Sequence, residues 1–441
     1  MTPGEFAIRR GRPLMGSFQP PGDKSVTHRA VLFGMLANGE TRIHRPNPGE
    51  DCRRSLDAAM ALGAACTQSS DATWTIQGTG MRPRASDAAI DCGNSGTTMR
   101  LLAGVAAGID GETRLHGDAS LSRRPMGRVV EPLRAMGAEI EAAEGERPPL
   151  RVTGGALTGL DYAAPVASAQ VATCLLLAGL AAKGTTRVRL PGPARDHTER
   201  MLPAFGVPVH VAAGADGGRE VSVRGGARPV GCTLRVPGDF SAAAFLLAAA
   251  AAMPGAEVTV RGVSLNPTRT GLLDVLAGMG AEVRVTPAAE QAGEPVGDVT
   301  VRGPDELLAF DVPAAWIPRL IDEVPAWIVL ACAARGTSRV TGAGELRVKE
   351  SDRIVSLARN LTAVGIGVRE LPDGLEVTGG RARGARIEAH LDHRIVMAFA
   401  ALGAVADGTM SFDDVSSVAT SFPEFFPTLA ALGAGVEGVP A

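Results

Sequence analysis

Apolar and polar positions along this chain form a pattern that recurs six times. Each copy begins with a stretch that is apolar on nearly every side, as at Ala172–Leu180 and Ala242–Ala252, and continues into a stretch with a single apolar face, as at Arg53–Leu62. A helix that is apolar all round is buried, whereas a helix with one apolar stripe covers a core from outside. The pattern therefore predicts an inner and an outer helix in every copy, with short strands such as Ala7–Arg9 around them.

Glycines mark two fixed points in each copy. One ends the outer helix, at positions 63, 137, 206, 280, 365 and 433, and the other opens a strand, at positions 39, 111, 184, 255, 336 and 408. Glycine is the usual residue just past a helix end. Successive helix-ending glycines are 68 to 85 residues apart. This period exceeds that of the common open repeat arrays, so we expect compact α/β domains of three copies each.

Two chain reversals divide the copies into two sets. Pro20–Asp23 and Pro237–Asp239 each combine proline and glycine and precede a long apolar run. A chain of 441 residues is long enough for two sizeable cores. We expect one domain at 24–236 and a second built from 1–23 and 237–441.

Composition narrows the class of ligand. The net charge is −3 and aromatic residues make up 4% of the chain, which is unfavourable for nucleic acid or membrane surfaces. The longest apolar run, Ala242–Met253, is shorter than the roughly 20 residues that a membrane span needs. The first residues lack the apolar segment of a secretory signal, and the six cysteines form no C-x-x-C pair. We expect a cytoplasmic protein, a monomer, with small polar ligands.

Charged residues gather where the helices begin. Outer helices in three of the six copies start with arginine or lysine together with acids. Helix N-termini attract anions through their free N–H groups and the helix dipole. If the N-termini of both domains face one interdomain cleft, they create a positive pocket for ligands that carry several negative charges.

Each of these clusters also fits a plain structural role. Lys349–Arg353 resembles a solvated helix start with local salt bridges, and Ser168–Gln170 resembles a helix cap. His390 and His393 lack a third metal-ligating cluster, so we expect no metal, and nothing indicates a cofactor. Gly22–Ser25 lacks the full phosphate-binding loop of nucleotide hydrolases. These clusters nevertheless share one position in the repeat, namely the starts of the helices. This shared position favours a site for acid–base chemistry on anions.

Five segments together resemble the 5-enolpyruvylshikimate-3-phosphate synthase family over essentially the whole chain. They are Pro21–Ala30, Gly93–Arg100, Arg124–Gly127, Leu346–Arg353 and Asp392–Arg394. The resemblance implies an enolpyruvyl transferase fold, also described as an inside-out α/β barrel. In this fold, each of two domains has three βαβαββ repeats, and helix N-termini face the interdomain cleft.

The resemblance also implies transfer of the enolpyruvyl group of phosphoenolpyruvate to the 5-hydroxyl of shikimate 3-phosphate, with release of phosphate. The implied residues for shikimate 3-phosphate are Lys24, Ser25, Arg29, Ser168, Ala169, Gln170, Arg195, Asp322 and Lys349. Those for phosphoenolpyruvate are Lys24, Asn94, Gly96, Arg124, Gln170, Arg353 and Arg394. The domain at 24–236 is then expected to bind mainly shikimate 3-phosphate. The other domain is expected to contribute acid–base and phosphoenolpyruvate-binding residues.

Two opposite proton transfers require two poised groups. We interpret Asp322 as the base toward the hydroxyl, Glu350 as the residue that handles the methyl proton, and Lys24 as an acid and anion clamp. Three positions depart from many relatives: Thr420 replaces a lysine, Ala169 a serine and Arg195 a tyrosine found in some of them. Gly96 keeps the small residue associated with binding of the inhibitor glyphosate, so sensitivity to this inhibitor stays open.

Two alternatives remain at this point. The related transferase that acts on UDP-N-acetylglucosamine typically uses a loop cysteine, and the corresponding loop, Gly117–Arg124, has none. A non-catalytic anion-binding protein on the same repeat is the other alternative, against which Lys24, Asp322 and Glu350 argue.

Overall fold

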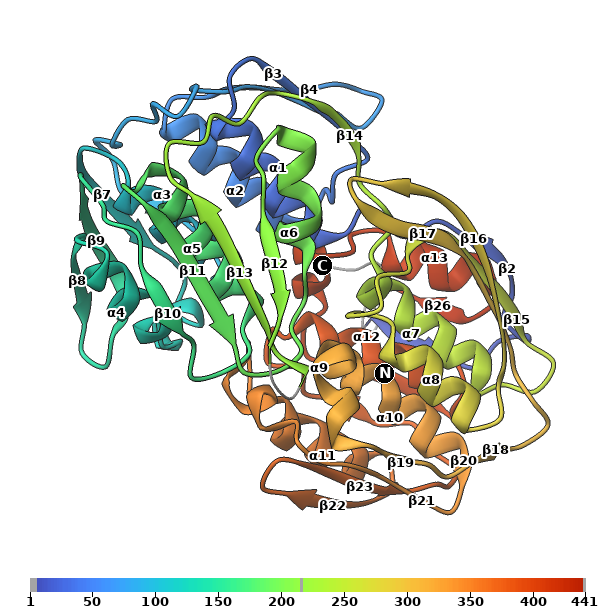
Figure 1. Ribbon diagram of the computed structural model, residues 1–441. Coiled ribbons are helices and arrows are strands. Elements are labelled where there is room, and N and C mark those ends of the chain that lie inside the picture. Colours follow the sequence, from blue (N-terminus) through green and yellow to red (C-terminus); the bar gives the residue numbers. More distant parts are fainter. Residues whose placement is uncertain (1–5, 215–216, 439–441) are drawn as a thin grey trace. The chain divides into compact units, whose positions relative to one another are not determined.

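The computed structural model describes residues 6–214 and 217–438, which form two compact α/β units (Figure 1). Within these residues, unit 1 comprises 6–21, 238–289 and 295–438, and unit 2 comprises 22–214, 217–237 and 290–294. The chain changes unit at 21–22 and 237–238, within the two Pro-Gly reversals. Nothing in the sequence pattern indicated the short segment 290–294, which comes from a hairpin that is otherwise part of unit 1.

Unit 2 contains three copies of a β-α-β-α-β-β repeat. The first copy has α1 (Lys24–Leu36), β3 (Glu40–His44), α2 (Glu50–Ala61), β4 (Ala65–Gln68) and β5 (Thr73–Gln77). The second has β6 (Ile90–Asp91), α3 (Gly96–Ala107), β7 (Gly111–His116), α4 (Gly127–Ala135), β8 (Glu139–Ala143) and β9 (Arg147–Gly154). The third has β10 (Asp161–Ala163), α5 (Ala169–Ala181), β11 (Thr185–Leu190), α6 (His197–Met201), β12 (His210–Ala213) and β13 (Arg219–Arg224), before β14 (Thr233–Arg235).

Unit 1 repeats the same order. After β1 (Ala7–Arg9) and β2 (Met15–Phe18), its first copy has α7 (Phe240–Ala251), β15 (Glu257–Ser264), α8 (Gly271–Gly278), β16 (Glu282–Gln291) and β17 (Glu294–Arg302). Its second copy has β18 (Leu307–Leu308), β19 (Asp311–Val312), α9 (Ile317–Leu320), α10 (Val324–Ala333), β20 (Ala334–Arg335), β21 (Thr337–Val340), α11 (Arg353–Ala363), β22 (Gly367–Leu371) and β23 (Gly374–Thr378). Its third copy has β24 (Arg386–Ile387), α12 (His393–Gly403), β25 (Thr409–Phe412), α13 (Phe425–Leu432) and β26 (Gly435–Glu437).

Each copy contributes to a four-stranded sheet with the same strand order, as in β6-β7-β9-β8 and β10-β11-β13-β12. The first two strands of a sheet run parallel and the others antiparallel. Three sheets are completed by strands from distant parts of the chain: β14 joins β3, β2 joins β15, and β1 lies between β25 and β26. The predicted α/β class and repeat are confirmed. In the described part of the chain, the strands form separate open sheets rather than one closed barrel.

The inner and outer helices are buried as the apolar pattern predicts. Every residue of α7 is buried, and α2 buries only the face that carries Cys52, Leu56 and Ala59. The twelve marker glycines all have positive φ, between 73° and 132°. At Gly63 an added Cβ would meet no atom within 4 Å, so the backbone conformation alone explains the glycine there. Two separate apolar cores result, one in each unit.

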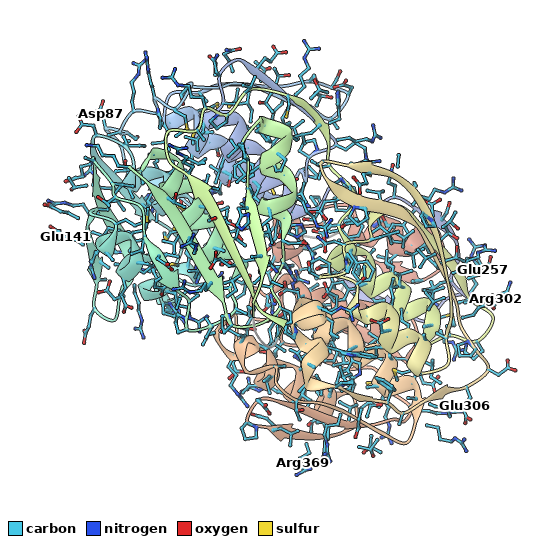
Figure 2. The ribbon with its side chains drawn as sticks, in the orientation of Figure 1. Asp87, Glu141, Glu257, Arg302, Glu306 and Arg369 are labelled. Carbon is cyan, nitrogen blue, oxygen red and sulfur yellow. The ribbon has the colours of Figure 1, made fainter. Side chains whose placement is uncertain are left out.

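The outer surfaces of the sheets carry paired charges. Glu257 and Arg302, labelled in Figure 2, form one such exposed pair, with 2.9 Å between Oε2 and Nε. Exposed pairs of this kind contribute little to stability. All six cysteines are free thiols, and burial raises the pKa of Cys92 to about 12. Among the helices of the described residues, none is both long and apolar enough to cross a membrane.

Candidate functional site

The inner helices of unit 2 begin at capped N-termini that carry many of the expected binding residues. Asp23 caps α1 by accepting a hydrogen bond from the N–H of Val26 (2.9 Å), and Ser95 caps α3 by accepting from that of Thr98 (3.1 Å). Ser168 caps α5 in the same way. The caps satisfy one N–H group each, and at the start of α3 the N–H of Gly96 also donates to the carbonyl oxygen of Asn94 at 3.1 Å.

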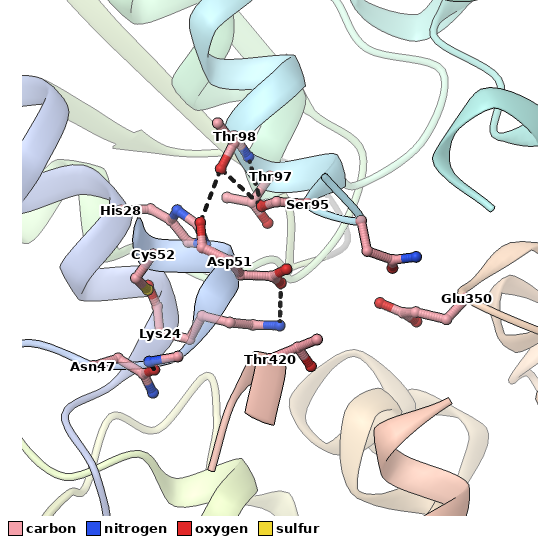
Figure 3. A network of polar contacts seen from close by, with 12 residues as sticks. Lys24, His28, Asn47, Asp51, Cys52, Ser95, Thr97, Thr98, Glu350 and Thr420 are labelled. Carbon is pink, nitrogen blue, oxygen red and sulfur yellow. Dashed lines mark hydrogen bonds and ion pairs between the residues drawn. The ribbon is translucent and has the colours of Figure 1, made fainter. Parts of the chain in front are cut away.

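Lys24 is the first residue of α1 and forms an ion pair with Asp51 on α2, with 2.9 Å between Nζ and Oδ2 (Figure 3). The exposed fractions of the two side chains are 16% and 11%. This pair holds the ammonium group at the start of α1. Asp51 was not predicted as part of the site, although it lies in the charged start of the second helix.

A chain of hydroxyl groups lies behind this pair. His28 Nδ1 contacts Ser55 Oγ at 2.8 Å, and Ser55 Oγ contacts Thr98 Oγ1 at 2.9 Å. Thr98 Oγ1 also lies 2.8 Å from Ser95 Oγ and 3.2 Å from the carbonyl oxygen of Asp51 (Figure 3). Burial, with the nearby charges of Lys24 and Arg29, lowers the pKa of His28 well below its usual 6.5. Through Ser55 and Thr98, a neutral imidazole on α1 is thus connected to α2 and α3.

Arg29 lies on α1, one helical turn after Ser25, and is 2% exposed. Its Nε donates to Thr198 Oγ1 and its Nη2 to Thr173 Oγ1, both at 2.8 Å, and its Nη1 donates to the carbonyl oxygen of Ser25. Burial lowers the pKa of this guanidinium to about 10, although Glu199 and Asp23 partly oppose the shift. Arg29 is therefore a fixed cation that joins α1 to α5 and α6.

Gln170 follows the cap of α5 and is hydrogen-bonded at both ends of its amide. Its Nε2 donates to Thr97 Oγ1 (2.8 Å), and its Oε1 accepts from Arg100 Nη1 (2.9 Å). Arg100 was not predicted as a site residue. It lies one helical turn after Gly96 on α3, and that spacing is the signal that could have identified it.

Arg124 approaches the start of α3 from the loop before α4 and is 7% exposed. Its Nη2 donates to Asn94 Oδ1 at 2.6 Å and to Ser120 Oγ at 3.2 Å. An added Cβ on Gly96 would lie 3.3 Å from Arg124 Nη1 and 2.9 Å from Arg100 Nη1. The structure thus brings Asn94, Gly96 and Arg124 together, as expected for one anion subsite. The other expected binding residues of unit 2 are all half-buried: Ser25, Ser168, Ala169 and Arg195.

In unit 1, three cations surround the carboxylate of Asp322, which is 8% exposed. Asp322 Oδ1 lies 3.6 Å from Lys349 Nζ and 3.7 Å from Arg353 Nη1, and Oδ2 lies 4.0 Å from Arg394 Nη2. Arg394 Nη1 also donates to the Asp322 carbonyl oxygen at 2.8 Å. We refer to Asp322, Lys349, Glu350, Arg353, Asp392 and Arg394 as the Asp322 cluster.

Arg353 is the most enclosed cation of this cluster, at 1% exposed. Its Nη2 donates to Glu350 Oε2, and its guanidinium also contacts both carboxylate oxygens of Asp392. Burial disfavours its charge, but the carboxylates of Asp392, Glu350 and Asp322 outweigh burial and raise the pKa of Arg353. The guanidinium is therefore permanently charged. Asp392 was expected as part of a motif at a helix start, and it caps α12; its contact with Arg353 was not predicted.

Thr420 lies at the end of the 3-10 turn Ser416–Thr420 of unit 1. Its hydroxyl donates to the carbonyl oxygen of Ser417 at 2.7 Å. The side chain thus forms a local hydrogen bond, and it supplies no cation at the position where the resemblance implies a lysine.

Comparison with known proteins identifies the family of this chain. The family described as EPSP synthase (3-phosphoshikimate 1-carboxyvinyltransferase) matches residues 8–429. A 3-phosphoshikimate 1-carboxyvinyltransferase of Anaeromyxobacter sp. is 49% identical over 97% of this chain and 96% of its own length. The protein of that name from Acidithiobacillus ferrooxidans is 48% identical over 96% of both chains.

Solved structures give the same result. EPSP synthase from Acinetobacter baumannii superimposes with a TM-score of 0.87 at 41% identity, over 98% of this chain and 99% of the other. The enolpyruvyl transferase NikO from Streptomyces tendae has a TM-score of 0.76 at 18% identity, covers both chains fully, and shares the fold. With a family match over nearly its whole length and relatives close to half identical, this chain belongs to the EPSP synthase (3-phosphoshikimate 1-carboxyvinyltransferase) family.

Proposed function

We propose that this chain transfers the enolpyruvyl group of phosphoenolpyruvate to the 5-hydroxyl of shikimate 3-phosphate, and that residues of both units share the work. The overall reaction is that of its family, in the shikimate pathway. The observation that best supports the assignment of roles is the Asp322 cluster, where one carboxylate lies within 4.0 Å of three cations. Such a cluster suits substrates that each carry several negative charges.

The binding roles follow the charges and hydrogen-bond donors of the site. Unit 2 binds mainly shikimate 3-phosphate, and unit 1 adds the acid–base groups and further contacts to phosphoenolpyruvate. The groups for shikimate 3-phosphate are Lys24, Ser25, Arg29, Ser168, Ala169, Gln170, Arg195, Asp322 and Lys349. The groups for phosphoenolpyruvate are Lys24, Asn94, Gly96, Arg124, Gln170, Arg353 and Arg394. We add Arg100 as the residue that orients Gln170.

The reaction takes two steps in this proposal. In the first, Asp322 removes the proton of the 5-hydroxyl, and the hydroxyl oxygen bonds to C2 of phosphoenolpyruvate. Glu350 delivers a proton to C3 in the same step. In the second, the resulting tetrahedral ketal loses a proton from its methyl group to Glu350, the C2–O bond to phosphate breaks, and the proton taken up by Asp322 leaves with the phosphate. Lys24 and the arginines stabilise the charge on carboxylate and phosphate throughout. All of these steps are carried out by side chains, and the enzyme acts as a monomer in the cytoplasm.

Phosphate release tests the reaction directly. The purified protein is supplied with phosphoenolpyruvate alone, with added shikimate 3-phosphate, or with UDP-N-acetylglucosamine in its place. We expect inorganic phosphate only with shikimate 3-phosphate. Release with UDP-N-acetylglucosamine would contradict the acceptor assignment. An Asp322→Asn variant with unchanged kcat would contradict the assignment of the base while leaving the reaction intact.

A further inference from the structure

A group of four buried polar side chains in unit 1 includes the residue that follows Asp322, and none of the four has a role in the reaction described above. They are Asp239, Ser241, Arg269 and Glu323, with exposed fractions of 6%, 2%, 2% and 0%. Burying charged groups is costly unless they are paired and hydrogen-bonded. The arrangement of these side chains therefore needs a physical reason.

Their contacts form a directed chain. Arg269 Nη2 donates to Ser241 Oγ at 2.7 Å and lies 3.4 Å from Asp239 Oδ1. Ser241 Oγ in turn donates to Glu323 Oε1. The hydroxyl thus accepts from a cation and gives its single proton to a carboxylate. Both of its hydrogen bonds are strengthened by charge, and each polarises the other.

This chain of hydrogen bonds joins three separate segments of unit 1. Ser241 lies in the first turn of α7, which Asp239 caps by accepting from the N–H of Ala242 at 3.2 Å. Arg269 lies in the loop before α8. Glu323 ends the 3-10 turn Ile321–Glu323 and occupies the N-cap position of α10, but its carboxylate makes no capping hydrogen bond. The Glu323 carboxylate is directed to Ser241 instead.

Consecutive carboxylates in this turn thus have different partners. Glu323 bonds to Ser241, whereas Asp322 faces Lys349, Arg353 and Arg394. Arg394 also holds the turn through the Asp322 carbonyl oxygen. A turn of only three residues has little internal hydrogen bonding of its own. Its position therefore depends on the adjoining helices α9 and α10 and on these two anchors.

We propose that Arg269, Ser241 and Glu323 act as positioning residues for the reaction, and that they hold the turn so that Asp322 is oriented toward the acceptor hydroxyl. The inference rests on the proposed role of Asp322 as the base. A displacement of about 1 Å at a reacting group lowers the rate by about 100-fold, so an anchor one residue away has a large effect on turnover. It has a small effect on binding, because the anchor touches no substrate.

Two variants interrupt this chain of hydrogen bonds, and a third variant keeps it. We expect Ser241→Ala and Glu323→Gln to lower kcat by about 10- to 100-fold and to change either KM by less than about threefold. Ser241→Thr keeps the hydroxyl and is expected to retain kcat within about threefold of the unchanged enzyme. The control is Ser338→Ala on β21, a fully buried serine of unit 1 whose Oγ accepts from the N–H of Phe310 at 3.1 Å. It loses a buried hydrogen bond but should keep kcat.

A double-variant cycle separates positioning from general support of the fold. If these hydrogen bonds act through Asp322, Ser241→Ala causes no further loss of kcat in an Asp322→Asn background. Losses that simply multiply would overturn the inference, as would a Ser241→Ala protein with reduced stability and unchanged kcat. An Asp322→Asn protein with unchanged kcat would refute the base assignment and the inference with it. Phosphate release by the unchanged enzyme tests the reaction independently of both.

Discussion

Arg353 contacts both carboxylate oxygens of Asp392, with 2.9 Å from Nε to Oδ2 and 3.2 Å from Nη2 to Oδ1. Both side chains are almost completely enclosed, at 1% and 0% exposed. Asp392 also accepts from the N–H of Arg394 at the start of α12 (3.0 Å). One carboxylate thus fixes the start of a helix and a buried guanidinium, whose Nη1 remains directed toward Asp322.

Replacing Asp392 tests this dependence. Asp392→Ala leaves the buried charge of Arg353 without its principal partner, so we expect the free energy of unfolding to fall by about 3–5 kcal/mol. Urea-induced unfolding measures the change. Asp352→Ala is the matched control, because Asp352 also caps a helix, α11, but is partly exposed. We expect the control to lose about 1 kcal/mol. Equal losses would show that the buried Arg353 pair adds nothing beyond capping and the exposed pair that Asp352 forms with Arg347.

Lys24 is the cation that we assign to both substrates. Lys24→Met removes one charge-assisted hydrogen bond of about 1.5–3 kcal/mol, so kcat/KM for phosphoenolpyruvate should fall by roughly 10- to 150-fold. Phosphate release at varied phosphoenolpyruvate measures it. Lys183→Met, at an exposed lysine of the same unit, is the control and should keep the parental value. A similar loss in the control would indicate a general effect of net charge instead.

The repeat could be predicted from the sequence because its markers act locally. A glycine such as Gly63 is required by its own backbone angle, and an inner helix such as α7 is recognised by its composition alone. The third outer helix was predicted less well. Only five residues, His197–Met201, are α-helical, and a 3-10 turn, Leu202–Phe205, follows because Pro203 has no N–H to continue the helix.

The partners within the site could not be predicted, because they depend on contacts between distant segments. Thr198 contacts Arg29 across 169 positions of the chain, and Asp51 contacts Lys24 across 27. Strands of three or four residues, such as β2 and β14, are too short to show a period and complete sheets formed elsewhere in the sequence. The motifs predicted the candidate site residues, and the tertiary structure shows which groups contact them.

Substitution of Gly96 tests the proposed phosphoenolpyruvate subsite formed by Asn94 and Arg124. In Gly96→Ala the new methyl group would lie within 3.3 Å of Arg124 and closer still to Arg100, so the ends of both side chains must move. We expect KM for phosphoenolpyruvate to rise by about tenfold or more, since a shift of 1.4 kcal/mol is sufficient. Steady-state phosphate release measures it. Gly155→Ala is the control, because an added Cβ there meets no atom within 4 Å. An unchanged KM in Gly96→Ala would remove Arg124 from the phosphoenolpyruvate site.

His28 gives a prediction for the dependence of stability on pH. Its pKa in the folded protein is lowered well below 6.5 by burial and by Lys24 and Arg29, whereas the unfolded chain keeps the ordinary value. Above pH 6.5 the imidazole is neutral in both states and its contribution to stability is complete. As the pH falls below that value, only the unfolded chain binds the proton. The free energy of unfolding therefore decreases by up to about 1.4 kcal/mol per pH unit until the folded pKa is reached.

His28→Asn isolates this contribution, because an amide at this position does not titrate and has a nitrogen or oxygen available for the hydrogen bond with Ser55. We expect the difference in unfolding free energy between the parent and the variant to be constant above pH 6.5 and to shift in favour of the variant from pH 6.5 to 5. Urea unfolding at a series of pH values measures both curves. His210→Asn, at an exposed histidine of β12, should follow the parent. Parallel curves for the parent and His28→Asn down to pH 5 would mean that His28 does not titrate differently on folding, and that the hydroxyl chain from Ser55 to Ser95 does not depend on a neutral imidazole.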